Sequence, residues 1–476
     1  CILTLSTTAL VKIPNVKSFA VPEKWSGWVA IHKEIEKPDT SKTVKPAPVD
    51  SLKLVAAMAV VPDTSLAKSK QPEGKPEPKK KPKKEGKDNG TKLIFRELAT
   101  GKEQVVPFAK DFRLAKEGQR ILLASTGNDS TWLPGVYLFD CASQSFKPMF
   151  RQKGEFKQLA LDEKGSQIAF FANLDTMKAQ VAPLGLCFWR DGLDSAQLIA
   201  DTASQFLPVQ NIRNLTASME LVNGGKKASG KRWLLSENAR PTFSKDGSKL
   251  YFGIAPPPIL PDTNLLEEEI VNVEVWKTDD GRMHTQQKVR LDDEKKRSYQ
   301  VVWHTADNQF VALAAEDLPE IQTGIEGNAN VAIGTTELPY LQFISWEGTA
   351  RKDVFLIDLK TGERTEIAKA LRATPRLSPG ANFAFWFNEI DSAWFSFSLK
   401  NNTLRRLTTN TGHPFFDEEN DIPDYPNSYG IAAWTKDDRH VLVYDRYDIW
   451  QIDPAGNEAP TNLTNGRSSR TVYRYL

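Results

Sequence analysis

The sequence has few of the side chains that usually carry nucleophilic, redox or metal chemistry. Its 476 residues include three Cys and five His. The cysteines Cys1, Cys141 and Cys187 form no Cys-x-x-Cys pair, and no His-Glu-x-x-His pair or Cys/His zinc spacing occurs. We therefore expect no metal and no cofactor, we expect Cys141 and Cys187 to be small core residues, and we expect each His to lie on the surface or in a loop.

Two further absences narrow the function. No Gly-x-Ser-x-Gly motif occurs, so the nucleophile elbow of the α/β-hydrolases is missing and no catalytic residue is expected in this chain. No apolar run is long enough to span a membrane, and no secretion signal begins the chain.

Cys1 fits either a lipidated first residue or a start within a longer protein, and the strand-like pattern of residues 2–12 favours the second.

The positive charge of the chain is concentrated in one segment. The window Ser69–Lys87 contains eight Lys and three Glu, a net charge of +5, whereas the whole chain carries +2. The rest of the chain therefore carries −3, which removes the electrostatic motive for nucleic-acid binding by a folded domain. The segment itself suits either a basic arm for a partner or a solvated low-complexity insertion, and its composition favours the insertion.

A turn-rich phrase followed by a short apolar run recurs seven times. The copies occupy Pro22–Ile31, Ala115–Ala124, Asp162–Phe171, Ser244–Gly253, Thr305–Ala314, Ser378–Phe387 and Thr435–Tyr444. A repeated supersecondary unit fixes the fold class, because each unit must bury its apolar faces against its neighbours.

A second phrase, an alternating apolar strand that ends in a polar turn, accompanies these copies. It occupies Leu93–Lys102, Val136–Ser143, Leu186–Gly192, Val273–Gly281, Val354–Thr365, Trp394–Asn402 and Ile449–Gly456. Two hairpins per unit make a four-stranded antiparallel sheet, and such sheets bury both faces when they pack radially. The sequence thus predicts an all-β fold, a β-propeller of seven or eight four-stranded antiparallel blades. A large β-sandwich is the less favoured alternative.

The repeats also define the organisation of the chain. Residues 1–33 should start the first visible blade, residues 34–91 should be a basic and mostly mobile insertion, and residues 92–476 should form the remaining blades. Long loops are expected near 200–240, 316–339 and 411–429. Long loops in a compact domain are usually functional or disordered.

Two acidic clusters are the remaining candidate sites. The first is Glu267, Glu268 and Glu269, placed just before a predicted strand, and the second is Asp417–Asp421 in the last long loop. Either cluster can hold a cation or a substrate amine through charge-assisted hydrogen bonds, or consist of solvated loop acids.

The stretch Tyr429–Gly466 resembles the propeller of bacterial, Bacteroidetes-type serine peptidases of the prolyl oligopeptidase family. The phrases Ser236–Gly253 and Asn15–Phe19 are similar to the same group. The resemblance covers nearly the whole chain except the basic insertion, and the Tyr429–Gly466 stretch is its most specific part.

The resemblance implies a function for the parent polypeptide. In that family an α/β-hydrolase domain follows the propeller, and the propeller gates and selects peptide substrates. The resemblance also implies a location in the periplasm or outside the cell. It further implies a role for Glu267, Glu268 and Glu269 in holding a substrate amine, although the residues around them match those of the family poorly. The main rival is a stand-alone propeller that binds a protein or a glycan without catalysis, and a structural subunit of an envelope complex is a third reading.

Overall fold

The computed structural model describes residues 2–4, 9–35, 89–127, 132–175, 177, 179–201, 233–260, 265–270, 273–409 and 411–476. The predicted insertion at 34–91 lies almost entirely outside the described residues, and so does most of the predicted loop at 200–240.

The first sheets are built from short antiparallel strands joined in chain order. β1 (Ile2–Thr4) pairs only with β2 (Ala9–Val11). A seven-stranded sheet follows, with β3 (Val16–Ala20), β4 (Trp28–Lys33), β5 (Thr91–Glu97), β6 (Glu103–Leu114), β7 (Arg120–Ser125), β8 (Gly135–Asp140) and β9 (Ser145–Arg151). The next sheet holds β10 (Glu155–Leu161), β11 (Gln167–Asn173), β12 (Leu184–Arg190) and β13 (Gln197–Asp201).

The remaining sheets repeat this plan. The strands are β14 (Leu234–Leu235), β15 (Thr242–Phe243), β16 (Lys249–Ala255), β17 (Tyr299–His304) and β18 (Gln309–Ala312); then β19 (Glu320–Gln322), β20 (Val331–Thr336), β21 (Lys352–Asp358) and β22 (Arg364–Leu371). Two four-stranded sheets complete the order, β23 (Arg376–Leu377), β24 (Phe383–Asn388), β25 (Ala393–Ser398) and β26 (Thr403–Arg406), and β27 (Ile431–Trp434), β28 (Val441–Tyr444), β29 (Ile449–Ile452) and β30 (Thr461–Asn462).

The seven-stranded sheet consists of two four-stranded halves that share β6. The first part of β6 pairs with β5, and its register shifts at Ala109, after which the strand pairs with β7. Residues of both halves, including Phe95 from β5 and Phe139 from β8, lie in one buried cluster. The long strand therefore turns from one sheet into the next, so that the two halves pack face to face.

The sheets between the first and the last of the series bury both faces against their neighbours. In β11, Ile168 and Phe170 belong to a core shared with β7–β9, whereas Ala169 and Phe171 belong to a core shared with β16–β18. Side chains alternate between the two faces of a strand, so consecutive residues serve different cores. Burying each large apolar side chain contributes about 1.5–3 kcal/mol, so the sheet interfaces dominate the stability of the fold.

The same division recurs near the C-terminus. In β24, Ala384 and Trp386 face the β19–β22 sheet, and Phe385 and Phe387 face the β27–β30 sheet. A further core joins the β14–β18 sheet to the β19–β22 sheet. This succession of antiparallel sheets, each packed against the next, is a β-propeller architecture and confirms the predicted fold class.

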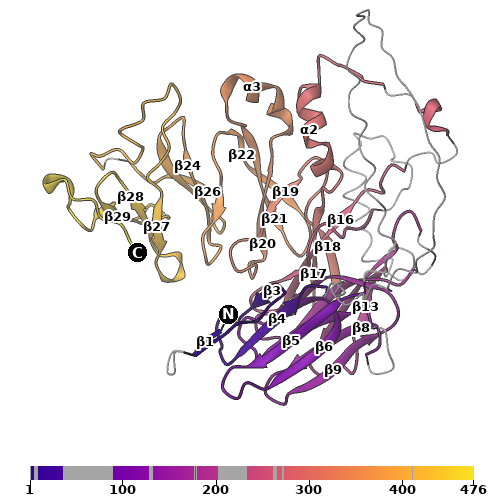
Figure 1. The fold of residues 1–476 in the computed structure, drawn as a ribbon. Helices are drawn as coiled ribbons and strands as arrows, with labels where there is room; N and C mark the ends of the chain where they lie inside the picture. Colours follow the sequence, from indigo (N-terminus) through magenta and orange to yellow (C-terminus); the bar gives the residue numbers. More distant parts are fainter. Residues whose placement is uncertain are drawn as a thin grey trace, which may run out of the picture.

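Figure 1 shows the sheets lying one after another in chain order. The β27–β29 strands lie at one end, followed by β24 and β26, then β19–β22, then β16–β18, with the β3–β9 sheet below them. The two helices α2 (His284–Glu294) and α3 (Ile344–Glu347) lie together above the sheets. The short helices η2 (Glu267–Glu269), η3 (Leu338–Phe343) and η4 (Lys436–Asp438) lie in connections between strands, and η5 (Arg467–Ser469) follows the last strand.

Two of the repeat assignments are wrong. The apolar run of the copy at Thr305–Ala314 forms β18, the last strand of its sheet, whereas the apolar runs of the other copies form second strands. The phrase Val273–Gly281 forms no strand, and Val273, Val275 and Trp276 are 62–69% exposed. The third strand of that sheet is β17, because its side chains fill the core and those of Val273–Gly281 do not.

The predicted loop at 316–339 is also wrong. It contains β19 and β20, which pair with each other and connect to β21. Its many Gly, Asn and Thr residues suggested a loop, but Ala332 and Ile333 are buried between neighbouring sheets. Tertiary packing here outweighs the weak strand propensity of the local sequence.

No helix among the described residues is long and apolar enough to cross a membrane. This agrees with the absence of a long apolar run in the sequence. The largest described helix, α2, has no buried residue and lies on the surface of the molecule.

Candidate functional site

Turns of the repeated phrase contact one another from sheet to sheet, and we call this arrangement the turn row. Its hydrogen bonds run from Lys24 N to Lys116 O (3.2 Å), from Glu117 N to Glu163 O (2.7 Å), from Gln167 Nε2 to Gly247 O (2.9 Å) and from Lys245 N to Glu326 O (2.9 Å). Gly165 and Gly247 have φ of +71°, a conformation that glycine adopts without strain. The repeated turn chemistry therefore ties the sheets together on one face.

Asp438 makes the corresponding connection between the last two sheets. Its carboxylate accepts hydrogen bonds from Ser378 Oγ (2.6 Å), Gly380 N (2.9 Å) and both nitrogens of Asn382 (3.2 and 3.0 Å). The residue is only 2% exposed. A buried carboxylate with this many donors fixes the relative position of the two turns.

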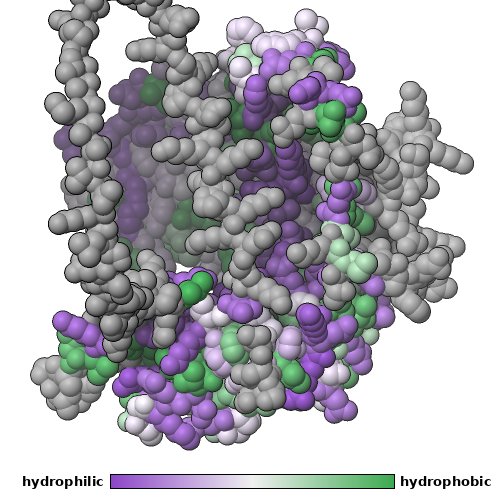
Figure 2. Space-filling model, turned by 45° about the vertical axis from the view of Figure 1, so that its right-hand side comes forward, coloured by the Kyte–Doolittle hydropathy of each residue, from purple (hydrophilic) through white to green (hydrophobic). Residues whose placement is uncertain are grey.

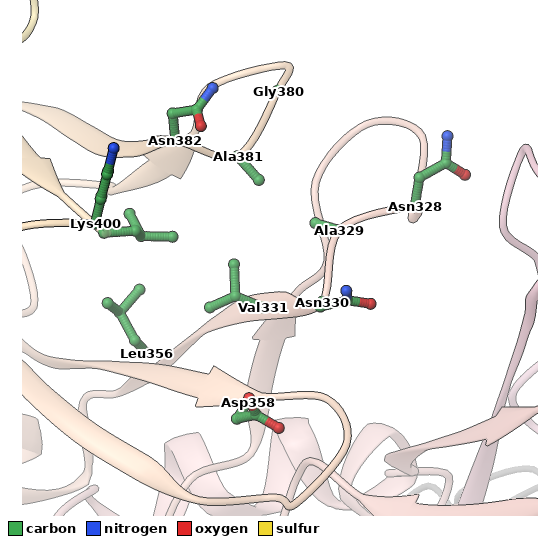
Figure 3. A pocket seen from close by; sticks show the side chains of 11 residues that line it. Asn328, Ala329, Asn330, Val331, Leu356, Asp358, Gly380, Ala381, Asn382 and Lys400 are labelled. Carbon is green, nitrogen blue, oxygen red and sulfur yellow. The ribbon is translucent and has the colours of Figure 1, made fainter.

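A groove of about 590 Å³ lies between the β19–β22 sheet and the β23–β26 sheet, next to the turn row. Figure 3 shows Val331 and Ala381 pointing into the gap, with Asn328 and Lys400 at its rim. The volume lies in the range of small-molecule and peptide-binding pockets. The lining residues include no Ser, Cys or His, and the ionisable ones are Asp358 and Lys400.

The first predicted acidic site lies away from this groove. Glu267, Glu268 and Glu269 form η2, and Glu268 and Glu269 are exposed. Glu269 Oε2 accepts a hydrogen bond from Leu266 N (2.9 Å), so this carboxylate caps its own short helix. These three residues were expected just before a strand, but Val273–Gly281 forms no strand. Their role in holding a substrate amine stays a prediction.

The second predicted acidic site is engaged by arginines. Glu418 Oε1 lies 2.7 Å from Arg467 Nη2, and Glu419 pairs with Arg446. The guanidinium groups of Arg446 and Arg467 also lie over the ring of Tyr447, at 5.3 and 5.2 Å. These two carboxylates already bind protein cations, and they fasten the loop at 411–429 to the last sheet.

A third arginine, Arg372, binds Asp424 of this loop. Arg372 is 5% exposed, and its Nη2 lies 2.6 and 2.7 Å from the two carboxylate oxygens of Asp424. Its Nε donates to Glu389 (2.8 Å). This arrangement could not be predicted from a local motif, because the three residues are separated by 17 to 52 positions.

The cysteines and histidines have structural roles. Cys141 and Cys187 are buried, as predicted, and they are not bridged; burial raises the pKa of both thiols to about 12. The expectation of surface histidines is wrong for His32, His304 and His440, which are 3–9% exposed. Among the described residues, no group of three metal-ligating side chains occurs.

Two of these buried histidines are fixed by backbone carbonyl groups. His32 Nε2 contacts Ala109 O at 3.1 Å, and His304 Nε2 contacts Leu359 O at 2.8 Å. Burial lowers the pKa of His32, which favours its neutral form. Both residues were misplaced because a lone His in a strand looks the same in sequence whether its ring faces water or a neighbouring sheet.

No family model and no curated protein sequence matches the chain. Among solved structures, the chain is similar to dipeptidyl peptidase 4 of Porphyromonas gingivalis, at 12% identity and a TM-score of 0.36, over 79% of this chain and 50% of that one. It is similar to a prolyl endopeptidase at 10% identity and a TM-score of 0.31, over 79% and 46%. It is also similar to the β-propeller domain of the Trilobed protease from Pyrococcus furiosus, at 8% identity and a TM-score of 0.29, over 79% and 90%.

The chain spans about half the length of the dipeptidyl peptidase and the prolyl endopeptidase that it matches. It spans most of the Trilobed protease propeller domain.

Proposed function

We propose that this chain is the gating and substrate-selecting propeller of a serine-type peptidase of the prolyl oligopeptidase family. Peptide-bond hydrolysis belongs to an α/β-hydrolase domain of the same parent polypeptide, and the propeller closes into seven or eight blades. The periplasm or the extracellular space is the proposed location, as the sequence resemblance implies.

The observation that supports this proposal most is that the stretch with the most specific family resemblance, Tyr429–Gly466, forms one complete sheet of the structure. The stretch Tyr429–Gly466 contains all of the β27–β30 sheet, which packs on its neighbour through Val441, Val443 and Trp450. A rigid frame of packed sheets suits a cap that excludes water and large substrates from a hydrolase site. Its exposed loops and grooves would then discriminate among peptides by a few polar contacts.

A second function is favoured by the groove in Figure 3. Its polar rim of Asn328, Asn330, Asn382 and Lys400 surrounds apolar side chains, an arrangement typical of a binding site. A stand-alone propeller that binds a protein or a glycan in this groove would need no hydrolase domain.

The experiment that separates the two functions is the intact mass and peptide map of the native protein from its source, combined with a fluorophosphonate serine probe. The proposal predicts a polypeptide several hundred residues longer than this chain, labelled by the probe on a residue outside Cys1–Leu476. A native chain of this length without a labelled companion would instead favour the binding propeller.

A further inference from the structure

A second pocket lies apart from the turn row, beneath the surface helix α2. It has a volume of about 480 Å³ and is enclosed by α2, by η3 and by the start of the β19–β22 sheet. The elements are held together by an ion pair between Arg282 Nη2 and Glu337 Oε1 (2.7 Å) and by hydrogen bonds from Gln342 Nε2 to the carbonyl groups of Thr278 and Asp280 (3.4 and 3.3 Å). The pocket is therefore part of the folded structure.

Most of the charges that line this pocket neutralise one another. Arg282 pairs with Glu337, and Arg297 forms two hydrogen bonds to Glu294, at 2.6 and 2.5 Å. Glu320 pairs with Lys352 at 3.3 Å. Within the part of the chain that the structure describes, Glu316 is the lining carboxylate without an ion-pair or hydrogen-bond partner.

The Tyr299 side chain also lines this pocket, and its charge interaction with Glu316 shows that the two groups are near one another. Tyr299 lines the pocket and is 7% exposed, and its hydroxyl has no hydrogen bond to any described residue. Burial and then the charge of Glu316 raise the pKa of Tyr299, and the other charges that act on it are Arg297 and Glu294, both in this pocket. The hydroxyl group is not one of the fully buried polar atoms, and it can exchange hydrogen bonds with a group that enters the pocket.

Part of the lining of the pocket is apolar. Leu291 from α2 and Leu338 and Leu341 from η3 line it. Lysine and arginine side chains have the matching form, an aliphatic stem that packs on apolar surface and a cationic head that requires acceptors. The remaining lining cation, Arg290, is exposed on α2, and its charge acts on Glu294.

We propose that this pocket binds the side chain of a basic residue of a peptide, with the cationic head between Glu316 and the Tyr299 hydroxyl group and the stem along Leu291, Leu338 and Leu341. This names a substrate class for the proposed peptide-selecting function and in that sense rests on it. Because the head is a side chain, a free peptide N-terminus is not required.

The test uses this 476-residue chain and end-capped, fluorescent heptapeptides that differ only at the central residue, which is arginine, lysine, norleucine or glutamate. Fluorescence anisotropy should show the two basic peptides binding about tenfold or more tightly than the norleucine peptide, because norleucine keeps the aliphatic stem but lacks the cationic head that makes charge-assisted hydrogen bonds. Raising the salt concentration should reduce this difference.

Two conservative variants locate the binding. Glu316→Gln should abolish the preference for basic peptides. Tyr299→Phe keeps the ring packed on Trp233 and should weaken the binding of basic peptides about threefold or more. Glu326→Gln removes a carboxylate outside the pocket and should change nothing. Circular dichroism would check that each variant is folded.

Equal binding of the basic and norleucine peptides would overturn the proposal, and so would unchanged preference in both pocket variants. Tighter binding of the glutamate peptide would also overturn it and would assign the pocket to anions through Arg290. Binding is measured without hydrolysis. The proposal for this pocket can therefore be refuted while the native protein still reacts with fluorophosphonate. Conversely, the peptidase proposal can be refuted while the pocket still binds basic peptides.

Discussion

Single carboxylates in this molecule act as connectors between distant backbone segments. Asp438 receives hydrogen bonds from residues 56 to 60 positions away and joins two sheets through them. We predict that Asp438→Asn lowers the free energy of unfolding by about 2–3 kcal/mol, because the new amide group faces donors and leaves at least one unpaired. Urea denaturation at pH 7 measures this.

The matched control is Asp437→Asn, an exposed neighbour with φ of 59°, a conformation that Asn tolerates. Its unfolding free energy should stay within about 0.5 kcal/mol of the unmodified chain. Equal losses in both variants would show that the hydrogen bonds of Asp438 add nothing specific.

Asp448 gives a pH-dependent prediction. It is fully buried, which raises its pKa, but hydrogen bonds from Gly466 N, Thr464 Oγ1 (2.7 Å) and Arg467 N (3.3 Å) outweigh burial and hold the pKa below its ordinary value. A lowered folded-state pKa means that the carboxylate stabilises the fold fully above about pH 3.9, the value in unfolded chains, and loses this effect as the pH falls through the folded value.

Asp448→Asn should therefore destabilise the chain by about 1–3 kcal/mol at pH 7, with a smaller difference at pH 3. Urea denaturation of both chains across this range would measure it. A destabilisation that stays constant from pH 7 to pH 3 would contradict the assignment of charge-dependent hydrogen bonds.

Among secondary-structure elements, stability should follow burial. α2 has no buried residue, whereas β11 and β16 are buried between sheets on both faces. Amide hydrogens open locally with free energies from about zero to that of global unfolding, depending on such packing. Hydrogen exchange followed by mass spectrometry should show α2 exchanging several orders of magnitude faster than β11 and β16. Comparable protection of α2 would mean that another part of the protein covers it.

The alternating strands were the predictable elements. Phe383–Phe387 combines apolar residues on both faces with a preceding turn, and this pattern correctly predicts a buried strand. Val273–Gly281 has the same local alternation but remains exposed. The local sequence shows only that a segment can form a strand. Whether it does so depends on packing against a neighbouring sheet, so the sequence alone did not distinguish β17 from this segment.

The candidate sites were less predictable than the strands. An acidic run such as Asp417–Asp421 is visible in sequence, but its partners Arg446 and Arg467 come from later turns of the chain. The pocket that contains Tyr299 and Glu316 gives no local motif, because it exists only where α2 covers the edge of the β19–β22 sheet.

The whole molecule is a succession of sheets in which each interface has its own core. Figure 2 shows that hydrophobic residues on the described surface of one side occur as small separate patches among hydrophilic ones. Large apolar side chains such as Trp386 are instead used between the sheets. Such a frame supports exposed loops and grooves without depending on them for stability, which is what a selective gate requires.

The most direct test of the gate is the activity of the native parent protein on one cleavage sequence in two forms, a short peptide and the same sequence within a stably folded protein. The account predicts hydrolysis of the peptide, inhibited by fluorophosphonate, and little or no hydrolysis of the folded protein. Equal cleavage of both substrates would contradict the gating role, and cleavage of neither would contradict the peptidase assignment.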